Sequence, residues 1–61
     1  MNYVIGKEAF NVGEIRGMHS NKNKATNQAE FLEKNKKELC CQSYIVMTQS
    51  EINKTKIELY A

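Results

Sequence analysis

The first twenty residues show two β-favouring runs that are separated by a short polar break. Residues 3–10 form the first run, residues 11–13 supply a loop with a glycine, and residues 14–18 form the return run. Gly6 and Gly17 interrupt the two arms, which predicts a bulge or a close backbone approach at each. We therefore expect a β-hairpin at the start of the chain.

A helical pattern follows a polar break at residues 20–24. Five residues recur at steps of four, three, four and three: Ala25, Ala29, Leu32, Lys36 and Leu39. This spacing forms one stripe of a helix, and Phe31 widens it at its edge. Asn27 followed by Glu30 resembles a capping box. The pattern predicts a helix over residues 25–39.

The C-terminal part contains two further β-favouring runs. Residues 43–49 are rich in β-branched and aromatic residues and apolar on both faces, which favours a central strand. Residues 55–60 alternate, with Ile57 and Leu59 on one face and Tyr60 on the other. Residues 50–54 would then form a hairpin loop.

A second interpretation exists for the end of the chain. Ile52, Lys56 and Leu59 are also spaced for a helix that begins at Ser50. The periodicity alone leaves both interpretations open, and we prefer the strand.

These segments predict an α+β fold: a small antiparallel sheet of order ββαββ with one helix packed on one face. The other sheet face would be exposed or form an interface. With 61 residues, we expect a single domain spanning residues 1–61. A chain of this size buries only about 60% of its unfolded surface, so a homodimer or a larger partner would stabilise it.

Composition narrows the partner classes. The net charge is +2, which is too small for strong steering towards nucleic acid. The longest uninterrupted apolar run, residues 44–47, is far shorter than the about 20 residues of a membrane helix, so we expect no membrane partner. We see no secretory signal and expect a cytoplasmic protein with reduced thiols. Lys, Asn and Ile make up 20 of the 61 residues, which suggests an AT-rich bacterial or phage gene.

Candidate chemistry is sparse. Cys40, Cys41 and His19 are the soft metal ligands besides Met, and adjacent cysteines lack the spacing of a zinc site. We find no nucleophilic set with an orienting partner and no glycine-rich phosphate loop. We therefore expect no enzyme, no metal and no cofactor. The motifs are structural and generic, and they indicate no particular family.

Our leading hypothesis is a small non-enzymatic regulator or inhibitor that acts by binding another protein. Exposed sheet edges can accept a partner strand, and tyrosines anchor protein interfaces. We expect Tyr44, Lys56 and Tyr60 near that surface.

The alternative hypothesis is a nucleic-acid-binding module. Arg16, Lys22 and Lys24 form a basic cluster that leads into the predicted helix, whose N-terminus attracts anions. Tyrosines on a sheet face would then stack on bases. The acidic residue Glu58 beside Tyr60 disfavours this hypothesis because it repels phosphate.

Overall fold

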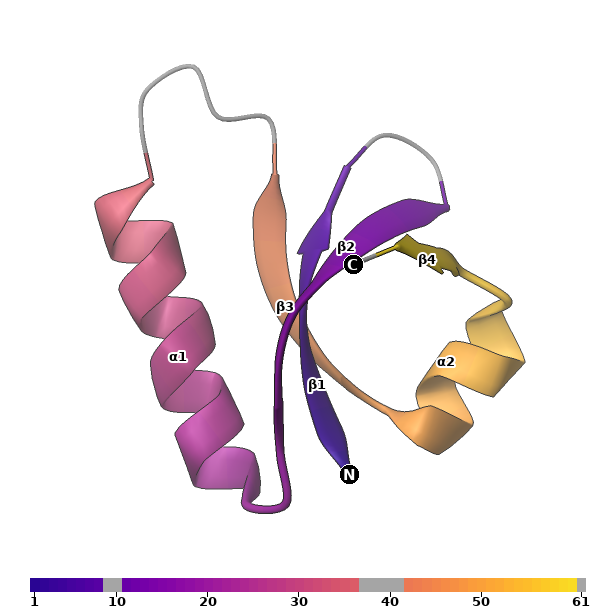
Figure 1. The fold of residues 1–61 in the computed structure, drawn as a ribbon, viewed down its shortest axis with the longest axis horizontal. Helices are drawn as coiled ribbons and strands as arrows, with labels where there is room; N and C mark the ends of the chain where they lie inside the picture. Colours follow the sequence, from indigo (N-terminus) through magenta and orange to yellow (C-terminus); the bar gives the residue numbers. More distant parts are fainter. Residues whose placement is uncertain (9–10, 37–41, 61) are drawn as a thin grey trace.

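The computed structural model describes residues 1–8, 11–36 and 42–60. In chain order, its elements are β1 (Asn2–Lys7), β2 (Val12–His19), α1 (Lys22–Asn35), β3 (Ser43–Thr48), α2 (Gln49–Thr55) and β4 (Glu58–Tyr60) (Figure 1). The predicted α+β class is confirmed, and α1 packs on the sheet as expected. Within the described ranges, no helix is long and apolar enough to cross a bilayer.

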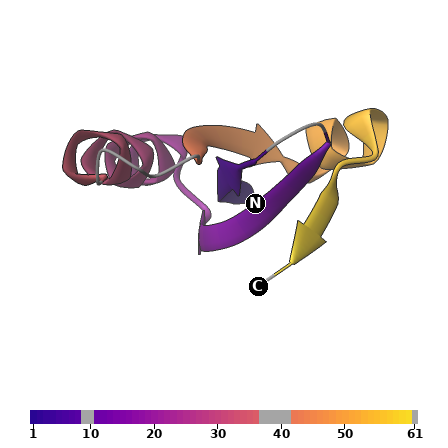
Figure 2. The ribbon, with the colours of Figure 1, turned by 90° about the horizontal axis from the view of Figure 1, so that it is seen from above.

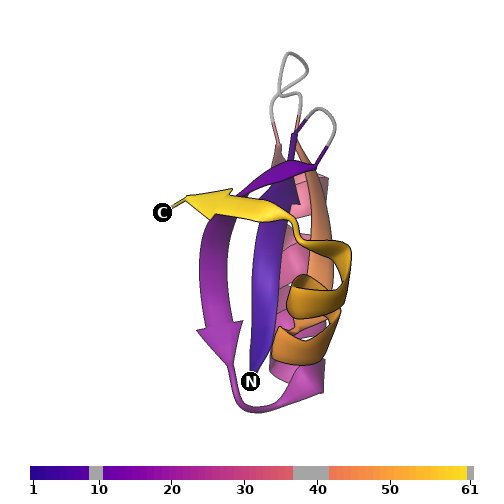
Figure 3. The ribbon, with the colours of Figure 1, turned by 90° about the vertical axis from the view of Figure 1, so that its right-hand side faces the viewer.

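The sheet has the strand order β3-β1-β2-β4. β1 runs antiparallel to both of its neighbours, whereas β4 runs parallel to β2. The sheet is therefore mixed, not wholly antiparallel. The physical reason is the connection: the segment expected to be a hairpin loop is the helix α2, which carries the chain from one sheet edge to the other (Figures 2 and 3).

Helix α2 is fixed by a capping box. The Thr48 side chain accepts a hydrogen bond from the Glu51 N–H, and the Glu51 carboxylate accepts one from the Thr48 N–H. The helix ends at Lys56, which adopts the left-handed conformation with φ 56° and donates its N–H to the Ile52 carbonyl at 2.9 Å. Both sequence interpretations thus hold in part: a helix from Gln49 and a short strand at residues 58–60.

The core lies on both faces of the central strand β1. Val4 faces α1 and packs with Ala25 and Ala29, while Ile5 faces the other side and packs with Met47 and Ile57. The second sheet face is therefore not open throughout, because α2 and the segment leading into β4 cover part of it (Figure 3).

Strand β3 lies at the sheet edge, so its predicted central position was wrong. Its residues are apolar on both faces because both faces are covered. Tyr44 and Val46 pack against the α1 cluster, and Ile45 and Met47 belong to the cluster on the opposite side. The apolar sequence of this segment correctly predicted that both of its faces are covered. It does not determine whether the strand lies at the centre or at the edge of the sheet.

Helix α1 begins three residues before the predicted start. Its N-cap is Asn21, whose side chain accepts hydrogen bonds from the N–H groups of Asn23 and Lys24 at 2.8 and 3.3 Å. The predicted capping box at Asn27 was therefore wrong. Phe31 is 64% exposed and does not widen the buried stripe.

The buried stripe itself is confirmed at Ala25 and Ala29, with Leu32 packed beside them. Lys36 is the C-cap of α1, and its ammonium contacts the Glu33 carboxylate at 2.9 Å. Leu39 lies outside the described residues.

The predicted hairpin is formed by β1 and β2. The Glu8 N–H donates to the Val12 carbonyl at 2.9 Å, and Gly13 lies within β2, not in the loop. Phe10 lies outside the described residues. A bulge leaves Arg16 as an extra residue, because Val4 pairs with Gly17 and Ile5 pairs with Ile15.

Candidate functional site

Two of the predicted docking residues lie in one row across the sheet. Tyr44 pairs with Gly6, Gly6 with Glu14, and Glu14 with Tyr60, so all four strands contribute one position. Lys56 is not in this row, because it ends α2 and is exposed there.

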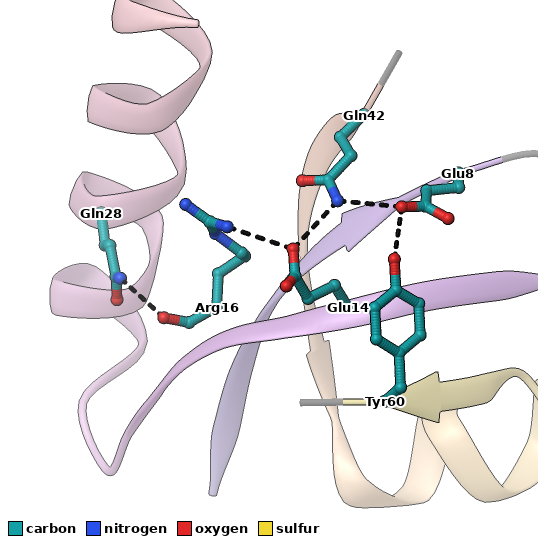
Figure 4. Close-up of polar contacts among 6 residues, drawn as sticks. All are labelled: Glu8, Glu14, Arg16, Gln28, Gln42 and Tyr60. Carbon is teal, nitrogen blue, oxygen red and sulfur yellow. Dashed lines mark hydrogen bonds and ion pairs between the residues drawn. The ribbon is translucent and has the colours of Figure 1, made fainter. Parts of the chain in front are cut away.

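Polar side chains around this row form a connected network, which we call the carboxylate clasp: Glu8, Glu14, Gln42 and Tyr60 (Figure 4). The Gln42 amide nitrogen donates to Glu8 Oε1 at 3.1 Å and to Glu14 Oε1 at 3.0 Å. The Tyr60 hydroxyl donates to Glu8, and Arg16 donates to Glu14 at 3.1 Å. The clasp thus ties together the ends of four strands.

Both carboxylates of the clasp are stabilised in the charged form. The Tyr60 hydroxyl, and then the Gln42 amide, lower the pKa of Glu8. The Gln42 amide, and then the Arg16 guanidinium, lower the pKa of Glu14. Their hydrogen-bond donors come from the chain itself, so we assign the clasp a structural role.

Gly6 makes room for the clasp. A Cβ atom at this position would overlap the Gln42 side-chain amide and lie 3.3 Å from the Tyr44 ring. The close approach that the sequence predicted at Gly6 is therefore confirmed. The identity of the approaching side chain could not be predicted, because Gln42 is 36 positions away.

The three predicted anion-binding residues have different surroundings. The Arg16 guanidinium is paired with Glu14, on the sheet. Lys22 and Lys24 lie in the first turn of α1, where there is no acidic residue. The charge of Lys22 helps to lower the pKa of Glu51 at the start of α2. Arg16 is therefore engaged with the clasp, apart from the helix start.

The soft-ligand candidates are not brought together in the part of the chain that the structure describes. Cys40 and Cys41 lie outside it, and no group of three or more His, Cys, Asp or Glu residues within it could hold a metal ion. His19 is engaged elsewhere, through its Nε2 atom and the Gln28 side chain.

Carboxylates from the two helices accept two of the outward N–H groups on the outer edge of β3. The Tyr44 N–H donates to Glu33 Oε2 of α1 at 3.4 Å, and the Thr48 N–H donates to Glu51 Oε1 of α2 at 3.1 Å. Since the backbone groups of alternate residues in a strand point to the same side, both N–H groups point away from β1. An incoming strand would have to displace these carboxylates.

The outer edge of β2 is divided into two parts. β4 pairs with residues 12–14 only. Residues 15–19 have β1 on one side and no described strand on the other (Figure 3). We call residues 15–19 the open edge.

Backbone alternation identifies Met18 as a residue that faces outward on the open edge. Thr48 pairs with Asn2 and points its N–H away from β1, so the backbone groups of Asn2 point towards β2. Asn2 pairs with His19 there, and His19 therefore points inward. Met18, one residue earlier, directs its N–H and C=O away from the sheet.

The open edge is held in position by Gln28 of α1. Its amide nitrogen donates to the Arg16 carbonyl at 3.2 Å, and its oxygen accepts from His19 Nε2 (Figure 4 shows the first contact). A Cβ atom at Gly17 would overlap this amide, so the predicted close approach at Gly17 is also confirmed. The bulged segment is thereby fixed before any partner arrives.

Apolar side chains adjoin the open edge on the face away from α1. Met18 pairs with Tyr3, which packs beside the Ile5 cluster. Met18 is 56% exposed, and Met1 is also exposed.

Comparison with known proteins finds no matching family model, no similar curated protein and no similar solved structure. The function is therefore inferred from the residues of this chain.

Proposed function

We propose that this chain is a small non-enzymatic regulator or inhibitor that binds another protein through the open edge, residues 15–19 of β2. The observation that carries the proposal is the contrast between two edges of one sheet. Carboxylates of α1 and α2 accept the outer N–H groups at Tyr44 and Thr48 of β3, while no described strand pairs with residues 15–19 of β2 on their outer side.

Strand addition suits this surface physically. Main-chain hydrogen bonds supply affinity, and side chains that alternate along the edge supply selectivity. Met18 and Tyr3 offer an apolar contact for one face of an added strand. Because Gln28 already fixes Arg16 and His19, the edge loses little conformational freedom on binding.

The experiment compares two substitutions at one position. Met18→Pro removes the outward N–H and leaves the bonds to β1 intact, because proline is tolerated on a strand edge. Met18→Leu keeps both the N–H and an apolar side chain of similar volume, so it is the matched control. A partner is first captured by the wild-type protein from a lysate of the encoding organism, then purified and titrated against all three proteins.

We expect Met18→Pro to weaken the partner about tenfold or more, since one lost hydrogen bond and a steric conflict exceed the roughly 1.4 kcal/mol of a tenfold change. Met18→Leu should remain within about threefold of wild type, a difference of under about 0.7 kcal/mol. Amide exchange of residues 15–19 should slow on binding. Equal affinity of the Pro and wild-type proteins would exclude this edge as the docking site.

Nucleic-acid binding remains the second candidate, supported by Lys22 and Lys24 in the first turn of α1 without an acidic neighbour there. A helix N-terminus and two ammonium groups attract phosphate. The test is titration with labelled oligonucleotides at low salt, against a Lys22→Gln, Lys24→Gln variant. Binding that falls with salt and is lost in the variant would support it, and the absence of binding would end it.

A further inference from the structure

We infer that, without a partner, the open edge pairs with the same edge of a second copy of the chain, so that the resting form is a two-fold symmetric dimer. The inference rests on the proposed function because it uses the same residues of β2. It adds a regulatory consequence: the partner must displace the second copy before it binds.

The register of such a pair follows from the outward residue. In an antiparallel sheet, two directly opposed, hydrogen-bonded residues exchange both N–H···O bonds. Met18 faces outward, so it can exchange both bonds with Met18 of the second copy across a two-fold axis. Gly17 then lies opposite His19, and Arg16 lies opposite Ser20, in both directions. The Arg16 and Ser20 carbonyls already accept hydrogen bonds from the Gln28 and Asn2 amides of their own chain, so the Met18 pair supplies the main-chain bonds across the axis.

This register is compatible with the charges and the space along the edge. Arg16 faces Ser20 and not another cation, and its guanidinium is already paired with Glu14. Gly17 has no side chain of its own, so the opposed His19 meets the Gln28 amide that lies over Gly17. No like charges oppose each other between residues 16 and 20, where repulsion would destabilise the pair.

The position of β4 also permits this pairing. β4 ends its pairing with β2 at Glu14, whereas the second copy would occupy residues 16–20. The two therefore occupy successive stretches of one strand edge. The outer edge of β3 does not offer the same opportunity, because Glu33 and Glu51 already accept its N–H groups at Tyr44 and Thr48.

The dimer also shields apolar surface. The exposed Met18 side chains would meet on the face away from α1, next to Tyr3 of each copy. For a chain of 61 residues this burial is useful, because small domains leave much apolar surface in water. With few main-chain bonds around the axis, the dimer is weak, and a partner with a longer strand displaces it.

The test is sedimentation analysis of the full chain over a wide concentration range at low and high salt. We expect a monomer–dimer equilibrium for wild type and for Met18→Leu. Met18→Pro should be monomeric. Met18→Lys should dissociate at low salt and recover partly at high salt, because it places two ammonium groups across the axis and salt screens them. Circular dichroism and thermal melting verify that each variant is folded.

A wild-type protein that stays monomeric at the highest concentration would overturn the inference, as would a Met18→Lys variant that dimerises like wild type at low salt. These outcomes are separate from those of the proposed function. If self-association is absent and Met18→Pro still loses the captured partner, the docking edge stands and the dimer falls. If the dimer forms and the partner binds Met18→Pro normally, the dimer stands and residues 15–19 are not the docking edge for the partner.

Discussion

The two outer edges of the long strands β3 and β2 differ in sequence and in protection. β3 reads Ser-Tyr-Ile-Val-Met-Thr, which is uncharged, free of Gly and Pro, and favourable for β-structure. Such a segment on an exposed edge is an aggregation hazard. It is also the edge where two carboxylates, from Glu33 and Glu51, accept outward N–H groups. The strand with the highest tendency to aggregate, β3, is thus the strand whose outer edge carries carboxylate acceptors.

The open edge of β2 is limited by its own sequence. Residues 15–19 include Arg16, Gly17 and His19, and a bulge interrupts the ladder at Arg16. A charge and a bulge both discourage unlimited strand addition. The fold therefore leaves open a strand that can pair only over a short stretch, and it places carboxylates on the strand whose sequence would favour continuous pairing.

The largest expected effect comes from Gly13→Ala, in the part of β2 that β4 covers. The new Cβ atom would lie 2.7 Å from Cγ2 of the fully buried Ile5 and 3.4 Å from Ile57. Overpacking of this kind costs about 1–3 kcal/mol. Urea unfolding should show the loss, and amide exchange at residues 58–60 should quicken as β4 loosens. An unchanged unfolding midpoint would mean that the core under β4 is looser than this packing indicates.

A smaller effect is expected from Gly17→Ala, in the open part of the same strand. The methyl group would displace the Gln28 amide, which loses its hydrogen bonds to the Arg16 carbonyl and the His19 ring. Two such bonds are worth about 0.5–1.5 kcal/mol each, and the stiffer unfolded chain of alanine returns about 0.4–1 kcal/mol. We expect a net loss of about 1 kcal/mol by urea unfolding.

The control for that prediction is a double-mutant cycle. In a Gln28→Ala background there is no amide to displace, so Gly17→Ala should be neutral or slightly stabilising. The amides of Tyr44 and Thr48 on β3 should keep their exchange rates in every variant. Additive losses from the two substitutions would show that Gln28 does not act through Gly17.

Local patterns predicted much of this fold, because each element is determined by nearby residues. The stripe at Ala25 and Ala29 predicted the helix and its buried face, and the alternation over residues 55–60 predicted a last strand, of which residues 58–60 form β4. The preferred interpretation of residues 50–54 as a hairpin loop was wrong, and the alternative helix from Ser50 is close to α2. The local signal for that helix is the capping box formed by Thr48 and Glu51.

The candidate site was less predictable because it depends on contacts between distant segments. Gly17 indicated a close approach, but no local pattern identifies Gln28 as the approaching residue. Tyr44 and Tyr60 were selected as surface anchors and lie in one row, yet the clasp engages Tyr60 with Glu8, 52 positions away. Which edge is closed follows from where α1 and α2 put their carboxylates.

The smallest and most selective effect is expected from pH, which should act on one edge and not on the other. Hydrogen bonds from Thr48 lower the pKa of Glu51, while the Lys36 ammonium and the Tyr44 N–H lower that of Glu33. A carboxylate with a lowered folded pKa stabilises the fold above its unfolded pKa, near 4.5, and this contribution is lost as the pH falls through the folded value.

The amide proton chemical shifts of residues on β3 and on β2 report the effect of pH on each edge separately. Between pH 6 and pH 3, values that bracket the ordinary carboxyl range, the Thr48 and Tyr44 amides should titrate with midpoints below 4.5, as their carboxylate acceptors are protonated. The Met18 amide should show no such step, because no carboxylate takes part in the contacts between Gln28, the Arg16 carbonyl and the His19 ring that hold the open edge. A Glu51→Gln substitution should flatten the Thr48 curve alone. A Met18 amide that follows the same curve as Thr48 would mean that the two edges are coupled and not independently protected.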